Sequence, residues 1–170
     1  MKELVLTKAP GSRKRSHLLS RRSYNTWRGM KERCTNPSHQ QYHYYGGAGI
    51  KVCERWERYE NFLADMGEPP EPTMQLDRID SSKDYEPTNC RWATRSQNTA
   101  NRRGWSKHGL KGVYKRPSGR YAAVMKVNKS MVTLGTFDTA AEAALAFDEA
   151  IKQRFGEFAV TNADMGRLEP

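Results

Sequence analysis

The sequence predicts an α+β protein in which a strand–strand–helix unit is followed by a three-stranded antiparallel sheet packed on one helix. The first unit is indicated by residues 73–103, which show a short apolar strand, a polar loop, a second strand and a polar helix. The second is indicated by a change beyond Gly109, where alternating apolar residues give way to a helix with an apolar stripe. A chain of 170 residues can hold two small units of this kind.

The N-terminal part of the chain is expected to contribute two helices on either side of a glycine turn. Residues 1–19 are basic and lack an apolar face, which predicts a flexible arm. A helix is expected from Ser20 to Cys34, ending before Pro37 because the residue that precedes a proline disfavours helix. The glycines of "YHYYGGAGIKVC" allow a tight turn before a short strand at "IKVC". Residues 57–66 then carry apolar side chains at helical spacing.

The remaining elements follow in order along the chain. "TMQLDRI" and "CRWAT" are typical of two strands, and "RSQNTANRR" of the helix after them. Residues 104–108 are expected to form a polar linker. "GVYKRPSGRYAAVMKV" predicts a hairpin, and "SMVTLGTF" a third strand beside it. Thr139 and Glu142 form a capping box that begins the last helix, and Gly156 ends it.

Charge is distributed in blocks along the chain, whose formal net charge is +10. Residues 1–34 and 91–133 are strongly basic, and the second range contains no aspartate or glutamate. A merely solvated surface would mix charges of both signs, so this distribution favours a polyanionic partner.

Membrane and secretory signals are lacking in the sequence. No apolar run is long enough to span a bilayer, and the N-terminus has no apolar signal segment. Cys34, Cys53 and Cys90 form no C-x-x-C pair, and an odd cysteine count fits a reducing compartment. We therefore expect a cytoplasmic protein with buried thiols. A structural zinc site built from the three cysteines and His39 is the less favoured alternative.

Four segments of the first unit, "YGGAGIKVCERW", "LDRID", "NCRWAT" and "QNTANRR", occur in this order. Together they resemble the HNH family of His-Me finger (ββα-metal) nucleases, and they look closest to the phage and mobile-intron homing endonucleases. The resemblance covers residues 24–103 and implies an HNH-like nuclease domain over residues 20–103. It also implies a hydrolase that cuts DNA with Mg²⁺ or Mn²⁺, located in a bacterial host cell if the protein is of phage origin.

The same resemblance assigns roles to individual residues. Asp77 and Asn98 are expected to bind the metal, because carboxylate and amide oxygens suit Mg²⁺. Asn89 is expected to pin the loop between the two strands. In most of the family the residue after the aspartate is the histidine that acts as general base, but here it is Arg78.

Arg78 cannot accept a proton near neutral pH, so its expected catalytic role is to hold the scissile phosphate. The general base is sought in "YHYY", with Tyr44 as the first candidate and His43 as the second. Tyr44 comes first because strand alternation in an extended segment would place it on the opposite side from Tyr45. Another tyrosine of this cluster and a metal-bound hydroxide remain open alternatives.

The segments "KGVYKRPSGRYAAVMKV", "LGTFDTAAEAALAFDEA" and "FGEFAVTN" resemble the APETALA-two/ethylene-response-factor DNA-binding domain. The resemblance implies a domain over residues 109–165 whose sheet enters the major groove while the helix packs behind it. With Val113 facing the helix, strand alternation predicts the outward residues. They are Tyr114, Arg116, Arg120, Val124, Lys126, Met131 and Thr133.

Among these DNA-binding candidates, Arg116 is the expected guanine reader, and Arg120 and Lys126 are expected to hold phosphates. The family usually has arginine or tryptophan at several of the outward positions. This sequence departs from that pattern, so base specificity is not carried over. The departures are Tyr114, Ser118, Val124, Met131 and Thr133.

Together, the two resemblances predict a metal-dependent DNA endonuclease whose cleavage site is selected by the C-terminal domain on double-stranded DNA. The alternative is a sequence-specific DNA-binding regulator with an inactive nuclease core. RNA binding is a third interpretation, which a groove-reading sheet disfavours. We expect a monomer or a weak dimer without membrane association.

Overall fold

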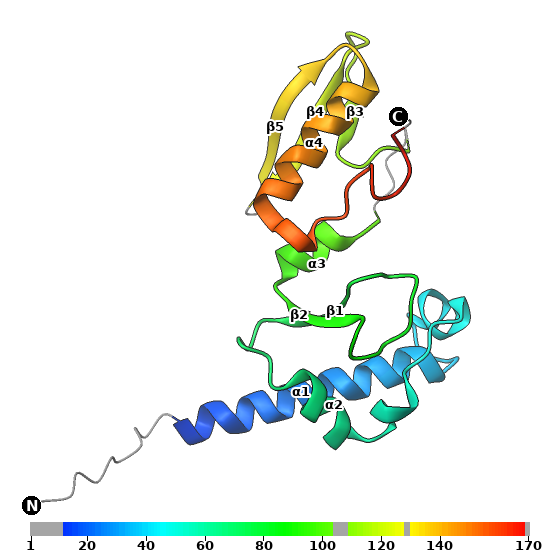
Figure 1. The fold of residues 1–170 in the computed structure, drawn as a ribbon, viewed down its shortest axis with the longest axis vertical. Coiled ribbons are helices and arrows are strands. Elements are labelled where there is room, and N and C mark those ends of the chain that lie inside the picture. The colour runs from blue at the N-terminus through cyan, green and yellow to red at the C-terminus, as the bar shows by residue number, and fades with distance from the viewer. Residues whose placement is uncertain (1–11, 104–108, 128–129, 169–170) are drawn as a thin grey trace, which may run out of the picture. The chain divides into compact units, whose positions relative to one another are not determined.

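The computed structural model describes residues 12–103, 109–127 and 130–168, with side chains from Arg21 onward (Figure 1). The chain divides into two compact units, Met1–Arg95 and Ser96–Pro170. The α+β class is confirmed, and so is the three-stranded antiparallel sheet. Among the described residues, no helix is both long and apolar enough to cross a membrane.

The first unit begins with a helix, α1, over Ser12–Thr35. It starts earlier than expected, because the stretch from Ser12 to Arg28 is rich in arginine and contains no proline or glycine. Residues 12–19, which were expected to belong to a flexible arm, are therefore helical. Short 3-10 helices follow at Tyr42–Tyr44, Gly46–Ala48 and Glu54–Glu57.

A second helix, α2, spans Tyr59–Met66 and precedes two short antiparallel strands. These are β1 over Gln75–Arg78 and β2 over Cys90–Ala93, with Asp77 opposite Arg91. The strand expected at "IKVC" is reduced to a single bridge between Val52 and Tyr85.

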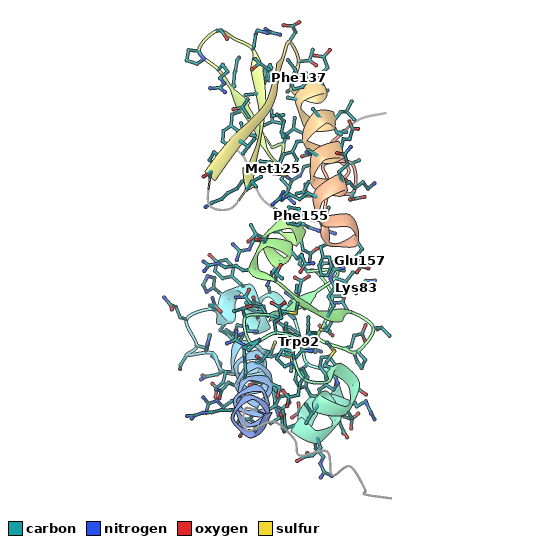
Figure 2. All side chains as sticks on the ribbon, turned by 90° about the vertical axis from the view of Figure 1, so that its left-hand side faces the viewer. Lys83, Trp92, Met125, Phe137, Phe155 and Glu157 are labelled. Carbon is teal, nitrogen blue, oxygen red and sulfur yellow. The ribbon has the colours of Figure 1, made fainter. Side chains whose placement is uncertain are left out.

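The core of the first unit forms around two aromatic side chains that are fully buried, Trp56 and Phe62. Their rings meet edge to face, 5.1 Å apart. Trp92 of β2 packs against the same cluster (Figure 2). Cys90 is buried in it, and burial raises the pKa of its thiol to about 12, so it is an unreactive packing residue at neutral pH.

The second unit contains a short helix, α3 over Arg95–Asn101, followed by the sheet and its covering helix. The strands are β3 over Val113–Lys115, β4 over Tyr121–Val127 and β5 over Ser130–Phe137, in the order β3-β4-β5. Helix α4 spans Ala140–Phe155 and is followed by a 3-10 helix at Gly156–Phe158.

The predicted capping box of α4 is confirmed. Thr139 Oγ1 accepts a hydrogen bond from the Glu142 amide at 3.2 Å, and the Glu142 carboxylate accepts one from the Thr139 amide at 3.1 Å.

A ββα-metal core is not shown, although β1, β2 and α3 do follow one another in the chain. The reason is that α3 packs with the second unit. Ala100 lies in the same core cluster as Val113 and Phe147, and Lys111 Nζ donates to the Ala100 carbonyl at 2.6 Å. The range 20–103 expected for a nuclease domain is thus shared between two units, with the division after Arg95. The four domain ranges stay predictions, and the expected linker at 104–108 lies outside the described residues.

The core of the second unit lies between the sheet and α4. Ala123 on β4 and Ala143 and Ala144 on α4 are fully buried, so small side chains let the helix approach the sheet closely. Met125 and Phe137 lie on the side of the sheet that faces α4 (Figure 2).

A polar cluster ties the C-terminal segment to this core. Asp148 on α4 is buried and accepts hydrogen bonds from the Asn162 amide at 2.8 Å, from Asn162 Nδ2 at 2.8 Å and from the Ala163 amide at 3.0 Å. Asn162 Oδ1 in turn accepts from the Lys111 amide at 2.6 Å. Lys111 Nζ donates to the carbonyls of Ala100 and Val160 at 2.6 and 2.7 Å.

Raising the pH from about 8 toward 10.5 is expected to stabilise the second unit. Burial is the main cause that lowers the pKa of Lys111 from 10.5 to about 8, against an opposing effect of Asp148. Within this window the unfolded chain binds more protons at Lys111 than the folded chain. The free energy of unfolding therefore rises with pH, by at most about 1.4 kcal/mol per pH unit. Urea unfolding followed by circular dichroism would measure the slope.

Lys111→Met is the matched variant for this measurement. It should be less stable at every pH, because the carbonyls of Ala100 and Val160 lose their donor. It should also lack the pH-dependent component, so the stability difference between the two proteins should change between pH 8 and 10.5. Parallel pH profiles for the two proteins would show that Lys111 does not titrate in this window.

Candidate nucleic-acid interface

The sheet of the second unit has one face covered by α4 and one face turned away from it. Val113, Ala123 and Phe137 belong to the core on the α4 side. Since side chains alternate along a strand, the intervening residues lie on the opposite face. We call it the outer sheet face. It comprises Tyr114, Arg116, Arg120, Ala122, Val124, Lys126, Met131, Thr133 and Thr136.

The register of the strands places these residues in rows across the sheet. Tyr114 lies opposite Ala122, and Ala122 lies opposite Thr136. Further along, Val124 lies opposite Thr133, and Lys126 lies opposite Met131.

A β-bulge decides which residues of β5 lie on this face. Ala123 pairs with Gly135 but the next residue, Val124, pairs with Thr133, so Leu134 is the extra residue. Leu134 packs against the core. Without the bulge, Leu134 would lie opposite Val124 on the outer sheet face, and Thr133 would lie toward α4.

The basic residues of the outer sheet face differ in their surroundings. Arg116 is exposed, and its Nη2 lies 3.5 Å from Thr133 Oγ1, which places the guanidinium over the sheet. Lys126 is exposed beside Met131. Arg120 instead pairs through Nε with Asp138 at 2.8 Å and donates from Nη2 to the Thr136 carbonyl at 3.1 Å. Arg116 and Lys126 are therefore better placed than Arg120 to contact an anionic ligand.

Apolar side chains occupy the middle of the same face. Tyr114 and Met131 are 48% and 58% exposed, whereas Ala122, which lies opposite Tyr114 on β4, is fully buried by its neighbours. Val124 is half-buried. The outer sheet face thus combines an apolar centre with cationic groups, a combination that suits nucleic-acid bases and phosphates together.

Only some of the residues that the nuclease resemblance implies for a catalytic site lie in the first unit. Asp77 is 5% exposed, and its Oδ2 accepts from Arg91 Nε at 3.2 Å. Asn98 lies in the second unit, so a shared metal site at Asp77 and Asn98 stays a prediction, as does the binding of Mg²⁺ or Mn²⁺. Among the described residues, no three His, Cys, Asp or Glu side chains lie together as a candidate metal site.

Arg78 lies over two tyrosine rings, at 5.3 Å from the centre of Tyr45 and 4.8 Å from that of Tyr85. Its Nη1 also donates to the Lys83 carbonyl at 2.6 Å. Arg33 Nη2 donates to the hydroxyl of Tyr85 at 3.2 Å. Burial raises the pKa of Tyr85 to about 12, so its hydroxyl stays protonated near neutral pH.

Asn89 holds the loop between β1 and β2. Its Oδ1 accepts from the Asp80 amide at 2.9 Å, and its Nδ2 donates to the carbonyls of Asp80 and Asp84 at 3.1 and 2.8 Å.

The segment with His43 and Tyr44 has a different geometry from the one expected. Tyr42–Tyr44 forms a 3-10 helix, so strand alternation does not apply to it. Tyr44 is 68% exposed with its ring 3.8 Å from that of His43, whereas Tyr45 stacks on Tyr85. No role of Tyr44 or His43 as a general base follows from this arrangement.

Several residues of the structure were missed by sequence reasoning. In the second unit these are Lys111, Asp148 and Asn162; a polar residue at a buried position of the α4 stripe was the available signal for Asp148. In the first unit Arg91 was missed, although aligning the two strands would have placed it opposite Asp77.

The chain matches plant proteins in a comparison with curated sequences. It is 38% identical to Ethylene-responsive transcription factor FZP of Oryza sativa subsp. japonica over 102 residues, which is 59% of this chain and 30% of the relative. It is 53% identical to Ethylene-responsive transcription factor LEP of Arabidopsis thaliana over 61 residues, which is 35% of this chain and 29% of the relative.

Ethylene-responsive transcription factor 3 of Nicotiana tabacum is 47% identical over 55 residues, covering 31% of this chain and 24% of the relative. Across all matched relatives, the chain covers between 24% and 39% of their length. No family model and no solved structure matches the chain. The relatives support the resemblance to the ethylene-response-factor domain.

These relatives correct the functional interpretation of the first unit. The prediction of an HNH-type DNA endonuclease is wrong, because the matched proteins are transcription factors and none is a nuclease. The expectations of a hydrolase, a homing element, a phage protein and a metal-binding protein rested on that interpretation and are unsupported with it. The matched relatives come from plants, so an origin in a bacterial host cell is unsupported too.

Proposed function

We propose that this chain is a sequence-specific DNA-binding regulator that contacts duplex DNA through the outer sheet face. The observation that carries the proposal is the geometry of that face. Arg116 and Lys126 are exposed on a sheet whose covering helix, α4, lies on the opposite side. A sheet exposed in this way can enter the major groove without hindrance from the helix.

The charge distribution supports a DNA partner. Residues 91–133 contain no acidic residue, so attraction to phosphates is not opposed within the sheet strands up to Thr133. The two exposed basic side chains differ in chemistry. Arg116 has a planar fork that can donate to O6 and N7 of one guanine, whereas Lys126 is a point charge suited to a phosphate.

The regulatory role is supported by the relatives, which are ethylene-responsive transcription factors. Sequence-specific binding is the property that such a role requires. The expected monomer or weak dimer stays a prediction that analytical ultracentrifugation would test.

Arg116→Ala is expected to weaken binding to the preferred duplex by about 1–3 kcal/mol, which corresponds to about 5- to 150-fold in Kd. The preferred duplex is first identified by selecting the full-length protein against a random duplex library. Specificity should relax at one base pair and persist at the others, because a single guanine contact is lost. Fluorescence anisotropy with a panel of single-base variants of the duplex measures both effects.

Arg154→Ala is the matched control, because it removes the same charge from an exposed position on α4 rather than from the outer sheet face. It should bind the preferred duplex nearly as well as the unmodified protein. Equal losses in both variants would mean that Arg116 contributes general charge only, and the assignment of the outer sheet face would be wrong.

A further inference from the structure

We propose that the outer sheet face recognises thymine, through apolar contacts between its central side chains and the C5-methyl groups of thymines in the major groove. This inference rests on the proposed function and names the kind of sequence that the surface prefers. It concerns three residues at which the chain departs from the family it resembles, Tyr114, Val124 and Met131.

Two of these three side chains, Val124 and Met131, lack the groups needed to read other bases. In the major groove, guanine and adenine are recognised by side chains that pair hydrogen-bonding groups with N7 and O6 or N6. Val124 and Met131 carry no donor, and Met131 has only a weakly accepting sulfur. The one apolar group that a base pair presents in this groove is the thymine methyl. A methyl is therefore the partner that these side chains can recognise.

The exposure of the apolar residues supports a ligand in this place. Met131 is 58% exposed and Tyr114 is 48% exposed. Fully buried Ala122 lies in the row of Tyr114, and Val124 follows it on β4, so the apolar surface continues along the middle strand. Covering these side chains with thymine methyls would remove apolar area from water on both sides of the contact.

The charges around this apolar centre favour DNA over a protein partner. Arg116 lies over the sheet beside Thr133, and Lys126 lies directly opposite Met131. A partner that covers this surface must therefore carry negative charge close to an apolar group. The major groove does so, because thymine methyls lie between two phosphate backbones.

The β-bulge at Leu134 fixes the register that this contact needs. It places Met131 and Thr133, rather than Val132 and Leu134, on the outer sheet face. Met131 consequently lies opposite Lys126. The thioether of Met131 and the ammonium of Lys126 can then contact neighbouring positions of the groove.

The test replaces thymine by deoxyuridine, which removes only the methyl group. The full-length protein is first selected against a random duplex library at about 150 mM salt, and each thymine of the enriched site is then replaced in turn. We expect at least one replacement to weaken binding about fourfold, the effect of one buried methyl. Met131→Ala should weaken binding to the thymine duplex by a similar factor. At the position that Met131 contacts, replacing thymine should then have no further effect on Met131→Ala.

Leu145→Ala is the matched control. Leu145 is also 58% exposed, but it lies on α4, away from the outer sheet face. This variant should retain the full sensitivity to deoxyuridine.

The outcomes separate the two proposals. Failure of the selection to enrich any site would contradict the proposed function itself. An enriched site at which deoxyuridine binds as well as thymine would overturn the thymine inference while sequence-specific binding stands. A dimer in solution that Met131→Ala dissociates, with unchanged DNA affinity, would also overturn the inference, because the apolar centre would then bind a second copy of the chain.

Discussion

Gly112→Ala is expected to unfold the second unit and to abolish duplex binding. Gly112 has φ +75°, in the left-handed region, and an added Cβ would lie 2.0 Å from Cδ2 of Phe147. Phe147 is 4% exposed in the core between α4 and the sheet, so its ring has no room to move aside. The backbone strain of about 1–2 kcal/mol adds to an overpacking cost of about 1–3 kcal/mol or more. Together these approach the whole stability of a small unit, about 5 kcal/mol.

Thermal unfolding followed by circular dichroism would measure this loss for Gly112→Ala. The fluorescence of Trp27, Trp56 and Trp92 would report on the first unit if it is measured in a Trp105→Phe background, because the fourth tryptophan, Trp105, belongs to the second unit. The matched control is Gly119→Ala, at φ +87° in the β3–β4 hairpin, where an added Cβ meets nothing within 4 Å. It should cost only about 1–2 kcal/mol, from backbone strain alone. Equal destabilisation by the two variants would show that the contact with Phe147 is not the cause.

Asp148→Ala is expected to destabilise the second unit by about 3–5 kcal/mol. The substitution leaves three N–H groups of Asn162 and Ala163 without the carboxylate that accepts their hydrogen bonds. It also removes the carboxylate that does most to raise the pKa of the buried Lys111 ammonium. Urea unfolding at pH 7 would measure the change, and hydrogen exchange at Asn162 and Ala163 should become fast.

Glu149→Ala is the matched control for Asp148→Ala. It removes the same charge from the next position of α4, where the side chain is exposed and accepts a hydrogen bond from Gln153 on the same helix. Its effect should stay within about 0.5 kcal/mol. If Asp148→Ala were as mild, the polar cluster would not hold the C-terminal segment in place.

The second unit could be predicted from its sequence in considerable detail. Helix α4 buries one face of the sheet. The alternation of apolar and polar residues along each strand therefore indicates on which face each side chain lies. Tyr114, Arg116, Lys126 and Thr133 accordingly lie on the outer sheet face as expected. The partner of Arg120 was not predictable, because Asp138 reaches it across the sheet rather than along the sequence.

The first unit was predicted less well, for two physical reasons. Strand alternation predicts an extended segment from Tyr42 to Tyr44, but this segment forms a 3-10 helix next to the glycine turn. The order of elements along the sequence predicts that helix α3 packs with the strands before it. Its position is decided by tertiary packing of Ala100 and by the hydrogen bond from Lys111, and neither has a local signal. The endonuclease interpretation depended on that assignment and on short motifs.

The most direct test of the central claim is a competition titration with the full-length protein. A labelled duplex that carries the selected site is displaced by the same unlabelled duplex or by a scrambled duplex of equal length and composition, at about 150 mM salt. If the outer sheet face reads base sequence, the selected duplex should compete at least about 10³-fold better than the scrambled one. Equal competition by the two duplexes would show that binding depends on phosphate charge alone, and would contradict the account.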